Sequence, residues 1–335
     1  MVLLAKSCEE FRSVLDLELT VENRDAALGT CILIHYLCWC DLGFLEGQQR
    51  NLDGTYRRLD LSQDRLFLLS EGVRHVRYMS WQLPDPSGSI FWRLIHQRKC
   101  VMLRDSLAER GIEYGHLRSR IIDLYDDPRF HGKGPNLSSP TTPEDEAAAS
   151  APPSPSPSIR DLCQQQGQLP IWALPCAHMF SDAHILSIIA LRVPADDDQS
   201  EIEKELYKRL SFEIVADRIA LMIHITLLQE AETLEGASKV LDYSDPQLRD
   251  EVERCFLSFP LLTYRPFNDL ISQGDSRALV VLYFFYRGIR TVSLKLRNSW
   301  WAEERAVVME GILRHELQTR GIYDILREMN LGPMD

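Results

Sequence analysis

The stretch Ala278–Tyr286 reads ALVVLYFFY and decides the fold class. By periodicity alone, an apolar run of this length is either a buried strand or part of a buried helix. Its neighbours have helical spacing, and no partner strand with alternating apolar and polar residues occurs elsewhere in the sequence. We therefore predict a helix. Because this helix is apolar around its whole circumference, other elements must surround it.

Helical patterns continue on both sides of this run. Ile202, Leu206 and Leu210 recur every four residues among charged side chains, and Trp301 and Val308 lie two turns apart on a later segment. Such spacings place one apolar stripe on each helix. We predict an all-α chain with about ten to thirteen helices of ordinary length.

The longest weakly polar stretch, Ala26–Leu45, approaches the about 20 residues that cross a bilayer. It contains His35 and Asp41, and no second stretch of this kind accompanies it. We therefore predict a buried core helix and no membrane span. On this helix Cys31 and Cys38 share one face with His35, which suits two buried thiols and a core histidine.

Composition excludes several functions. The chain has 37 Lys and Arg against 49 Asp and Glu, a formal net charge of −12. Proteins that hold a phosphate backbone need clustered positive charge, so we expect no direct binding of nucleic acid. The N-terminus lacks the regions of a secretion signal. We expect an intracellular protein, in the nucleus or the cytoplasm, whose eight cysteines are reduced.

The composition changes sharply at one place. Residues 133–159 are rich in Pro and Ser and contain almost no large apolar side chain, so they cannot bury enough surface to offset their ordering entropy. We predict a disordered loop there. The flanking halves, residues 1–132 and 160–335, are predicted to be helical and to pack together into a single large domain.

Three segments carry a family resemblance. Residues 24–37, RDAALGTCILIHYL, and residues 65–74, RLFLLSEGVR, resemble the middle region of fungal zinc-cluster transcription factors, in which an apolar helix precedes a segment ending in Gly-(Val/Ile)-Arg. Residues 276–282, SRALVVL, followed by the pair Trp300–Trp301, resemble the C-terminal end of the sterol-uptake-control branch of that family. The similarity covers about residues 20–320. It implies an all-helical regulatory body, which in the sterol-sensing branch encloses a hydrophobic ligand.

The sequence departs from that family at its DNA-reading module. A zinc binuclear cluster needs six Cys with a C-x2-C-x6-C start. The closest grouping here is Cys31, Cys38 and Cys40, which does not have that spacing. We therefore expect a regulatory domain that stands alone. Six cluster-spaced Cys in frame upstream of Met1 in the transcript would restore a full transcription factor.

One group of residues has the composition of a zinc site. Cys176, His178, Asp182 and His184 are all zinc-type ligands within a short segment. A structural zinc site normally has a second pair of ligands farther along, and the sequence offers none with suitable spacing. We expect no metal here, and instead a core or pocket histidine or a hydrogen-bonding role for His178 or His184.

A second group resembles the metal motifs of class I terpene synthases. Residues 197–201, DDQSE, match the first motif, and Asn268 with Asp269 begins the second, which lacks its terminal Glu. Ser200 and Glu203 form a capping box, so the acidic residues lie at the start of a helix, where they complement its positive end. We expect neither a metal nor another cofactor.

Aromatic residues remain as candidates for a binding site. Residues 283–286 cover the circumference of their helix, which suits either a pocket for a small apolar molecule or the ordinary packing of a central helix. The predicted ligand-binding residues are Trp39, Trp172, His178, Tyr283, Tyr286, Trp300 and Trp301.

Two functions are consistent with these features. The first is a regulatory domain that binds a hydrophobic small molecule or a protein partner and acts on transcription through that partner. The alternative is a metal-free enzyme of natural-product biosynthesis, a cyclase or pericyclase, which needs only a shaped apolar cavity and one or two hydrogen-bond donors. The candidate donors are His178, His184 and Tyr283.

Overall fold

All regular structure that the computed structural model describes is helical, which confirms the all-α prediction. The described residues are 6, 19–46, 48, 59–91, 101–109, 111–130, 201–235, 245–263, 265–293, 300–329 and 331. The α-helices are α2 (Arg24–Cys40), α3 (Arg65–Leu68), α4 (Ser70–Gln82), α6 (Val101–Glu109), α7 (Gly115–Asp126), α10 (Glu201–Glu235), α11 (Pro246–Leu257), α12 (Arg265–Ser272), α13 (Ser276–Ser293), α14 (Trp300–Thr319) and α15 (Ile322–Glu328).

The predicted central helix is α13, and a tight turn sets its start. Gly274 has a φ of 64°, in the left-handed region that glycine adopts without a steric penalty, and it ends α12. The Asp275 carboxylate then accepts a hydrogen bond from the backbone N–H of Arg277 at 2.9 Å. This cap satisfies one of the free N–H groups at the helix start. Gly274 and Asp275 therefore stop one helix and begin the next.

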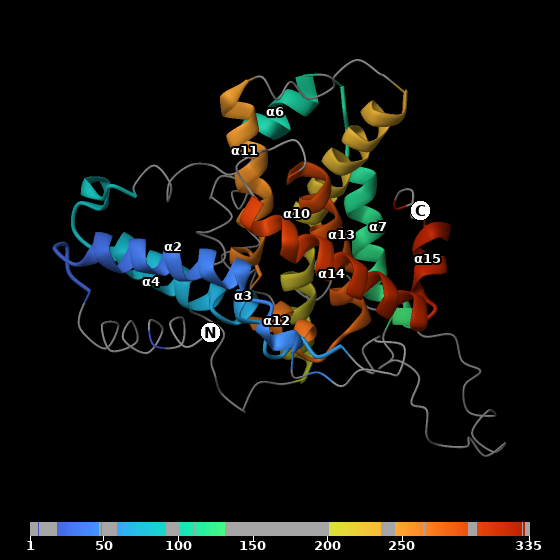
Figure 1. The fold of residues 1–335 in the computed structure, drawn as a ribbon, viewed down its shortest axis with the longest axis horizontal. Coiled ribbons are helices and arrows are strands. Elements are labelled where there is room, and N and C mark those ends of the chain that lie inside the picture. Colours follow the sequence, from blue (N-terminus) through green and yellow to red (C-terminus); the bar gives the residue numbers. More distant parts are fainter. Residues whose placement is uncertain are drawn as a thin grey trace.

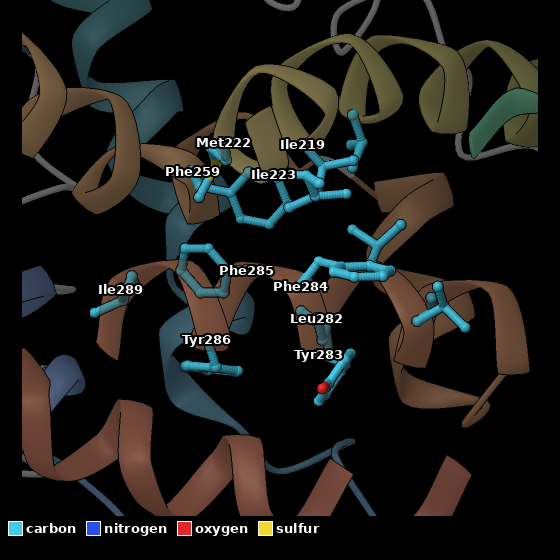
Figure 2. Packing of buried hydrophobic residues seen from close by; sticks show 14 of the residues in the cluster. Ile219, Met222, Ile223, Phe259, Leu282, Tyr283, Phe284, Phe285, Tyr286 and Ile289 are labelled. Atoms are coloured by element: carbon cyan, nitrogen blue, oxygen red, sulfur yellow. The ribbon is translucent and has the colours of Figure 1, made fainter. Parts of the chain in front are cut away.

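Other helices surround α13 on every side, as its composition requires. Every residue of Ala278–Tyr286 is buried. Figure 2 shows Phe285 and Phe284 on the side of α13 that faces Ile219 and Ile223 of α10, whereas Tyr283 and Tyr286 lie on the opposite side. That opposite side packs against α14. Within the described residues, the aromatic run thus has the packing of a central helix.

Both halves of the chain contribute to one hydrophobic cluster. It contains residues from Ile34 to Phe130 and from Phe212 to Leu331, and α13 lies at its centre. Helices α7, α10, α13 and α14 form the middle of the molecule, whereas α2 and α4 lie side by side at one end (Figure 1). The predicted disordered loop at 133–159 and the start of the second half lie outside the described residues.

Helix α2 is a core helix on one face only, which corrects the prediction for Ala26–Leu45. Cys31, His35 and Cys38 are buried, as predicted. The opposite face is open to solvent, although it is equally apolar. No helix among the described residues combines the length and hydropathy that crossing a membrane requires.

The close approach of α13 to its neighbours gives a test of this packing. A Cβ atom at Gly288 would lie 2.5 Å from Phe256 of α11 and 3.1 Å from the Thr226 hydroxyl of α10. We expect Gly288→Ala to lower the free energy of unfolding by about 1–3 kcal/mol, since the ring must move within a filled core. Urea denaturation followed by circular dichroism measures this change.

Gly311 of α14 is the matched control. It is exposed, and a Cβ there would meet nothing within 4 Å. Gly311→Ala should raise stability by about 0.5–1 kcal/mol, the usual gain from replacing glycine inside a helix. Equal effects of the two substitutions would contradict the close packing at Gly288.

Candidate functional site

The predicted binding residues fall into three groups. Trp172, His178 and His184 lie outside the described residues. Trp39, Tyr283 and Tyr286 are fully buried, and Trp301 is half-buried. Trp300 begins α14, and its side chain lies outside the described part of the chain. The described aromatic residues thus belong to the core or to its edge.

Tyr286 belongs to a buried polar cluster around Arg305 of α14. The Arg305 guanidinium pairs with the Asp64 carboxylate, and each of the two side chains is only 1% exposed. Arg305 Nε donates to the Tyr286 hydroxyl at 3.1 Å, and Nη1 donates to the backbone oxygens of Cys38 at 3.2 Å and Asp41 at 2.7 Å. Asp64 also caps α3, because it accepts the N–H of Leu66 at 3.0 Å. This cluster, which we call the Arg305 cluster, joins α2, α3, α13 and α14.

The Arg305 cluster keeps its arginine charged. Burial alone would lower the pKa of Arg305, but the charge of Asp64 and the Tyr286 oxygen raise it above its ordinary value. Burial also raises the pKa of Tyr286, so this phenol is neutral at physiological pH. Burial raises the pKa of the Asp64 carboxyl as well, and the charge of Arg305 and the Leu66 N–H oppose this rise. These mutual contacts hold α2, α3, α13 and α14 in position relative to one another.

Tyr283 of α13, one turn before Tyr286, lies in a second polar group. Its ring meets Tyr323 of α15 edge to face, with the ring centroids 6.1 Å apart. Burial and the adjacent Tyr283 hydroxyl raise the pKa of Tyr323 to about 12. Nearby, Glu310 pairs with Arg290 and also with Arg314, the latter at 3.0 Å. With that pKa, the Tyr323 phenol keeps its proton at neutral pH and is a hydrogen-bond donor, not a base.

The aromatic residues form a continuous series from the surface into the core. Tyr36 of α2 packs edge to face on Trp301 of α14, with centroids 4.8 Å apart. Trp301 contacts Trp39 at 5.7 Å, and Trp39 contacts Phe285 of α13 at 5.7 Å. Trp39 is buried, and its indole N–H has no hydrogen-bond acceptor among the described residues. Three ring contacts therefore connect Tyr36 at the surface with Phe285 in the central helix α13.

The outer face of α2 is the candidate functional surface. Leu33 is 65% exposed, Tyr36 45% and Leu37 49%, which is unusual for three large apolar side chains on one helix. Their spacing of three and four residues places them in one stripe, which Cys40 continues. Residues 26–40 contain no Asp, Glu, Lys or Arg. We call the stripe of Leu33, Tyr36, Leu37 and Cys40 the α2 surface.

Two carboxylates affect the pKa values of groups on this surface. Burial raises the pKa of Tyr36, and the charge of Glu253 on α11 raises it further. Burial likewise raises the pKa of the Cys40 thiol, with a further rise from Glu304 on α14. The basic group that acts on Cys40 is Arg305, which is buried and paired with Asp64. The Cys40 sulfur lies 3.8 Å from the Trp301 backbone oxygen, and the exposed Glu304 follows three residues later, so the α2 surface is apolar in its middle and has a carboxylate beside its Cys40 end.

The sequence shows the α2 stripe but not its exposure. An amphipathic surface helix has a polar face that reveals which side meets water. Residues 26–40 have no such face, so periodicity predicts burial on all sides. The absence of a polar face between Asp25 and Asp41 is the sequence signal that could have revealed a second apolar face on this helix.

The structure gives no support to the metal motifs that lie within the described residues. Asn268 of α12, in the partial second terpene-synthase motif, is buried and donates its side-chain N–H to the Phe67 backbone oxygen at 3.3 Å. Its neighbour Asp269 is exposed. Among the described residues, no cluster of three or more His, Cys, Asp or Glu side chains has the arrangement of a metal site. Residues 176–184 and 197–200 lie outside the described part of the chain.

Comparison of the chain with models of protein families, with curated proteins and with solved structures finds no match.

The Arg305 cluster gives a stability prediction. Asp64→Asn retains an oxygen that can cap α3 but leaves the Arg305 charge unpaired in the core. We expect a loss of about 3–5 kcal/mol in the free energy of unfolding, the usual cost of breaking a buried pair. Adding Arg305→Met should recover part of this loss, because the unpaired charge is then gone. Urea denaturation of the three variants measures both effects.

Asp127→Asn is the control for this cycle. Asp127 also caps a helical turn, through the Arg129 N–H at 2.9 Å, and pairs with the Arg129 side chain, but that side chain is 50% exposed. Its substitution should cost less than about 1 kcal/mol. A small effect of Asp64→Asn, equal to that of the control, would show that the buried pair does not hold the halves together.

Proposed function

We propose that the chain is a regulatory helical domain that acts on transcription through a protein partner, and that it resembles the effector half of fungal zinc-cluster transcription factors without their DNA-reading module. The α2 surface is the observation that supports this proposal. Monomeric proteins rarely leave a continuous apolar stripe in water, and such stripes are typical of binding surfaces. Partner binding would cover Leu33 and Leu37, which the fold leaves exposed on α2.

The burial of the predicted ligand-binding residues also favours a partner over an enclosed ligand. Trp39, Tyr283 and Tyr286 have no exposed surface, and neighbouring side chains pack around them. The Tyr286 hydroxyl accepts a hydrogen bond from Arg305, and the Tyr283 ring lies against Tyr323. These three residues stabilise the domain that presents the α2 surface, instead of lining a site open to a small molecule.

Deletion of the gene in its native host tests the proposal, with metabolites and transcripts profiled together. We expect the transcripts of a set of metabolic genes to fall. The variant Leu33→Glu should reproduce this loss at a normal protein level, because the substitution alters an exposed position and leaves the buried face of α2 intact. Leu68→Glu, at a leucine of α3 that is 47% exposed, is the matched control and should behave as wild type.

The enzymatic alternative predicts the opposite pattern. Deletion would then cause one intermediate to accumulate while transcripts stay unchanged. That outcome, with Leu33→Glu fully active, would overturn the regulatory proposal and direct attention to the donors His178, His184 and Tyr283.

A further inference from the structure

The α2 surface has features that select among the kinds of partner it can accept. Its middle is apolar, with three large side chains between 45% and 65% exposed. A helix face with residues at i, i+3, i+4 and i+7 is the pattern that recognises another helix, through side chains spaced in the same way. Leu33, Tyr36, Leu37 and Cys40 have this spacing. The complementary shape is therefore a second helix with its own apolar stripe.

The charge beside the α2 surface indicates which side chains should flank the apolar stripe of the partner helix. The Cys40 sulfur lies 3.8 Å from the Trp301 backbone oxygen, and Glu304 follows Trp301 by three residues on α14, so its carboxylate lies beside the Cys40 end of the α2 surface. Glu304 is exposed. A partner helix whose apolar stripe is flanked by Lys or Arg would place positive charge opposite this carboxylate. Such complementarity speeds association and rejects partners of the wrong charge.

The same charges disfavour two other occupants. A second copy of the chain would bring a formal net charge of −12 and a second exposed Glu304 to the interface. A membrane surface carries anionic lipids, and helices that lie on it have Lys and Arg on their polar face, whereas residues 26–40 have none.

We propose that the α2 surface binds an amphipathic helix with basic flanks from a partner protein. This inference rests on the proposed regulatory function and specifies the chemistry of its partner. The partner's apolar side chains cover Leu33 and Leu37 and contact Tyr36, while a Lys or Arg side chain on its flank meets Glu304. Through Tyr36 the bound helix touches the series of rings that passes through Trp301 to Trp39. Binding should therefore change tryptophan emission.

A designed peptide tests this proposal with the full-length chain. The probe is a fluorescein-labelled peptide of Leu and Lys with Leu at i, i+3, i+4 and i+7. Two further peptides serve as controls: one in which Glu replaces Lys, and one with the Leu/Lys composition scrambled so that no stripe forms. Fluorescence anisotropy gives the Kd of each. We expect the Leu/Lys peptide to bind and both controls to bind at least about tenfold more weakly.

Three variants assign the binding to the α2 surface. Leu33→Glu should weaken the Leu/Lys peptide by about tenfold or more, because an exposed leucine no longer becomes buried. Glu304→Lys should weaken it by about threefold, as expected for one exposed charge pair, and this effect should shrink at high salt. Leu68→Glu should change the Kd by less than about twofold. Unfolding midpoints that match wild type show that each variant is folded.

Several outcomes would overturn the proposal. Equal affinity of wild type and Leu33→Glu would place the peptide elsewhere, and equal binding of the Leu/Glu peptide would remove the role of charge. A dimer seen by sedimentation that Leu33→Glu dissociates would assign the surface to a second copy. Binding to vesicles of anionic lipid that Leu33→Glu abolishes would assign it to a membrane. None of these results depends on transcript levels in the host, so they are distinguishable from failure of the regulatory function.

Discussion

The buried charge of Arg305 is the constraint on which the arrangement of the helices depends. A guanidinium that is 1% exposed is stable only if acceptors surround it, because water no longer solvates it. Those acceptors come from distant segments: the end of α2 through the Cys38 and Asp41 oxygens, the cap of α3 through Asp64, and α13 through Tyr286. The position of each segment is therefore tied to the others. The N-terminal helices cannot shift against the C-terminal bundle without leaving that charge unsatisfied.

This anchoring determines which side of α2 meets solvent. The C-terminal end of the helix supplies a backbone oxygen to Arg305 and buries Trp39 beside Phe285, so its inner face is committed to α13 and α14. Leu33 and Leu37 lie on the side away from that contact and remain exposed. The apolar character of the two faces then has two separate explanations: the inner face stabilises the fold, and the outer face is the one for which we propose a partner.

The aromatic residues of α13 serve the core in different ways. Phe285 packs on Phe259 with centroids 4.5 Å apart, whereas the adjacent Tyr286 gives its oxygen to Arg305. Tyr283 lies one turn earlier, in a polar group where Tyr323 has a raised pKa. Neutral phenols held among paired charges are suited to fixing helices in place. Every residue of Ala278–Tyr286 is buried, so this aromatic run has the packing of a central helix.

Local pattern was enough to predict the helices, because an amphipathic stripe or an all-apolar run reflects only the spacing of neighbouring side chains. The helix at 278–286 and the helix that carries Trp301 and Val308 follow from this spacing alone.

The pairing of Asp64 with Arg305 does not follow from local spacing, since the two residues are 241 positions apart and each is an ordinary charged residue in its own segment. The exposure of Leu33 and Leu37 was likewise hidden, because a helix without a polar face looks the same whether one or two of its sides are covered. Tertiary packing decided both, by placing the ends of α2 and α3 where a buried arginine needs acceptors and leaving the far side of α2 with no neighbour in the described chain.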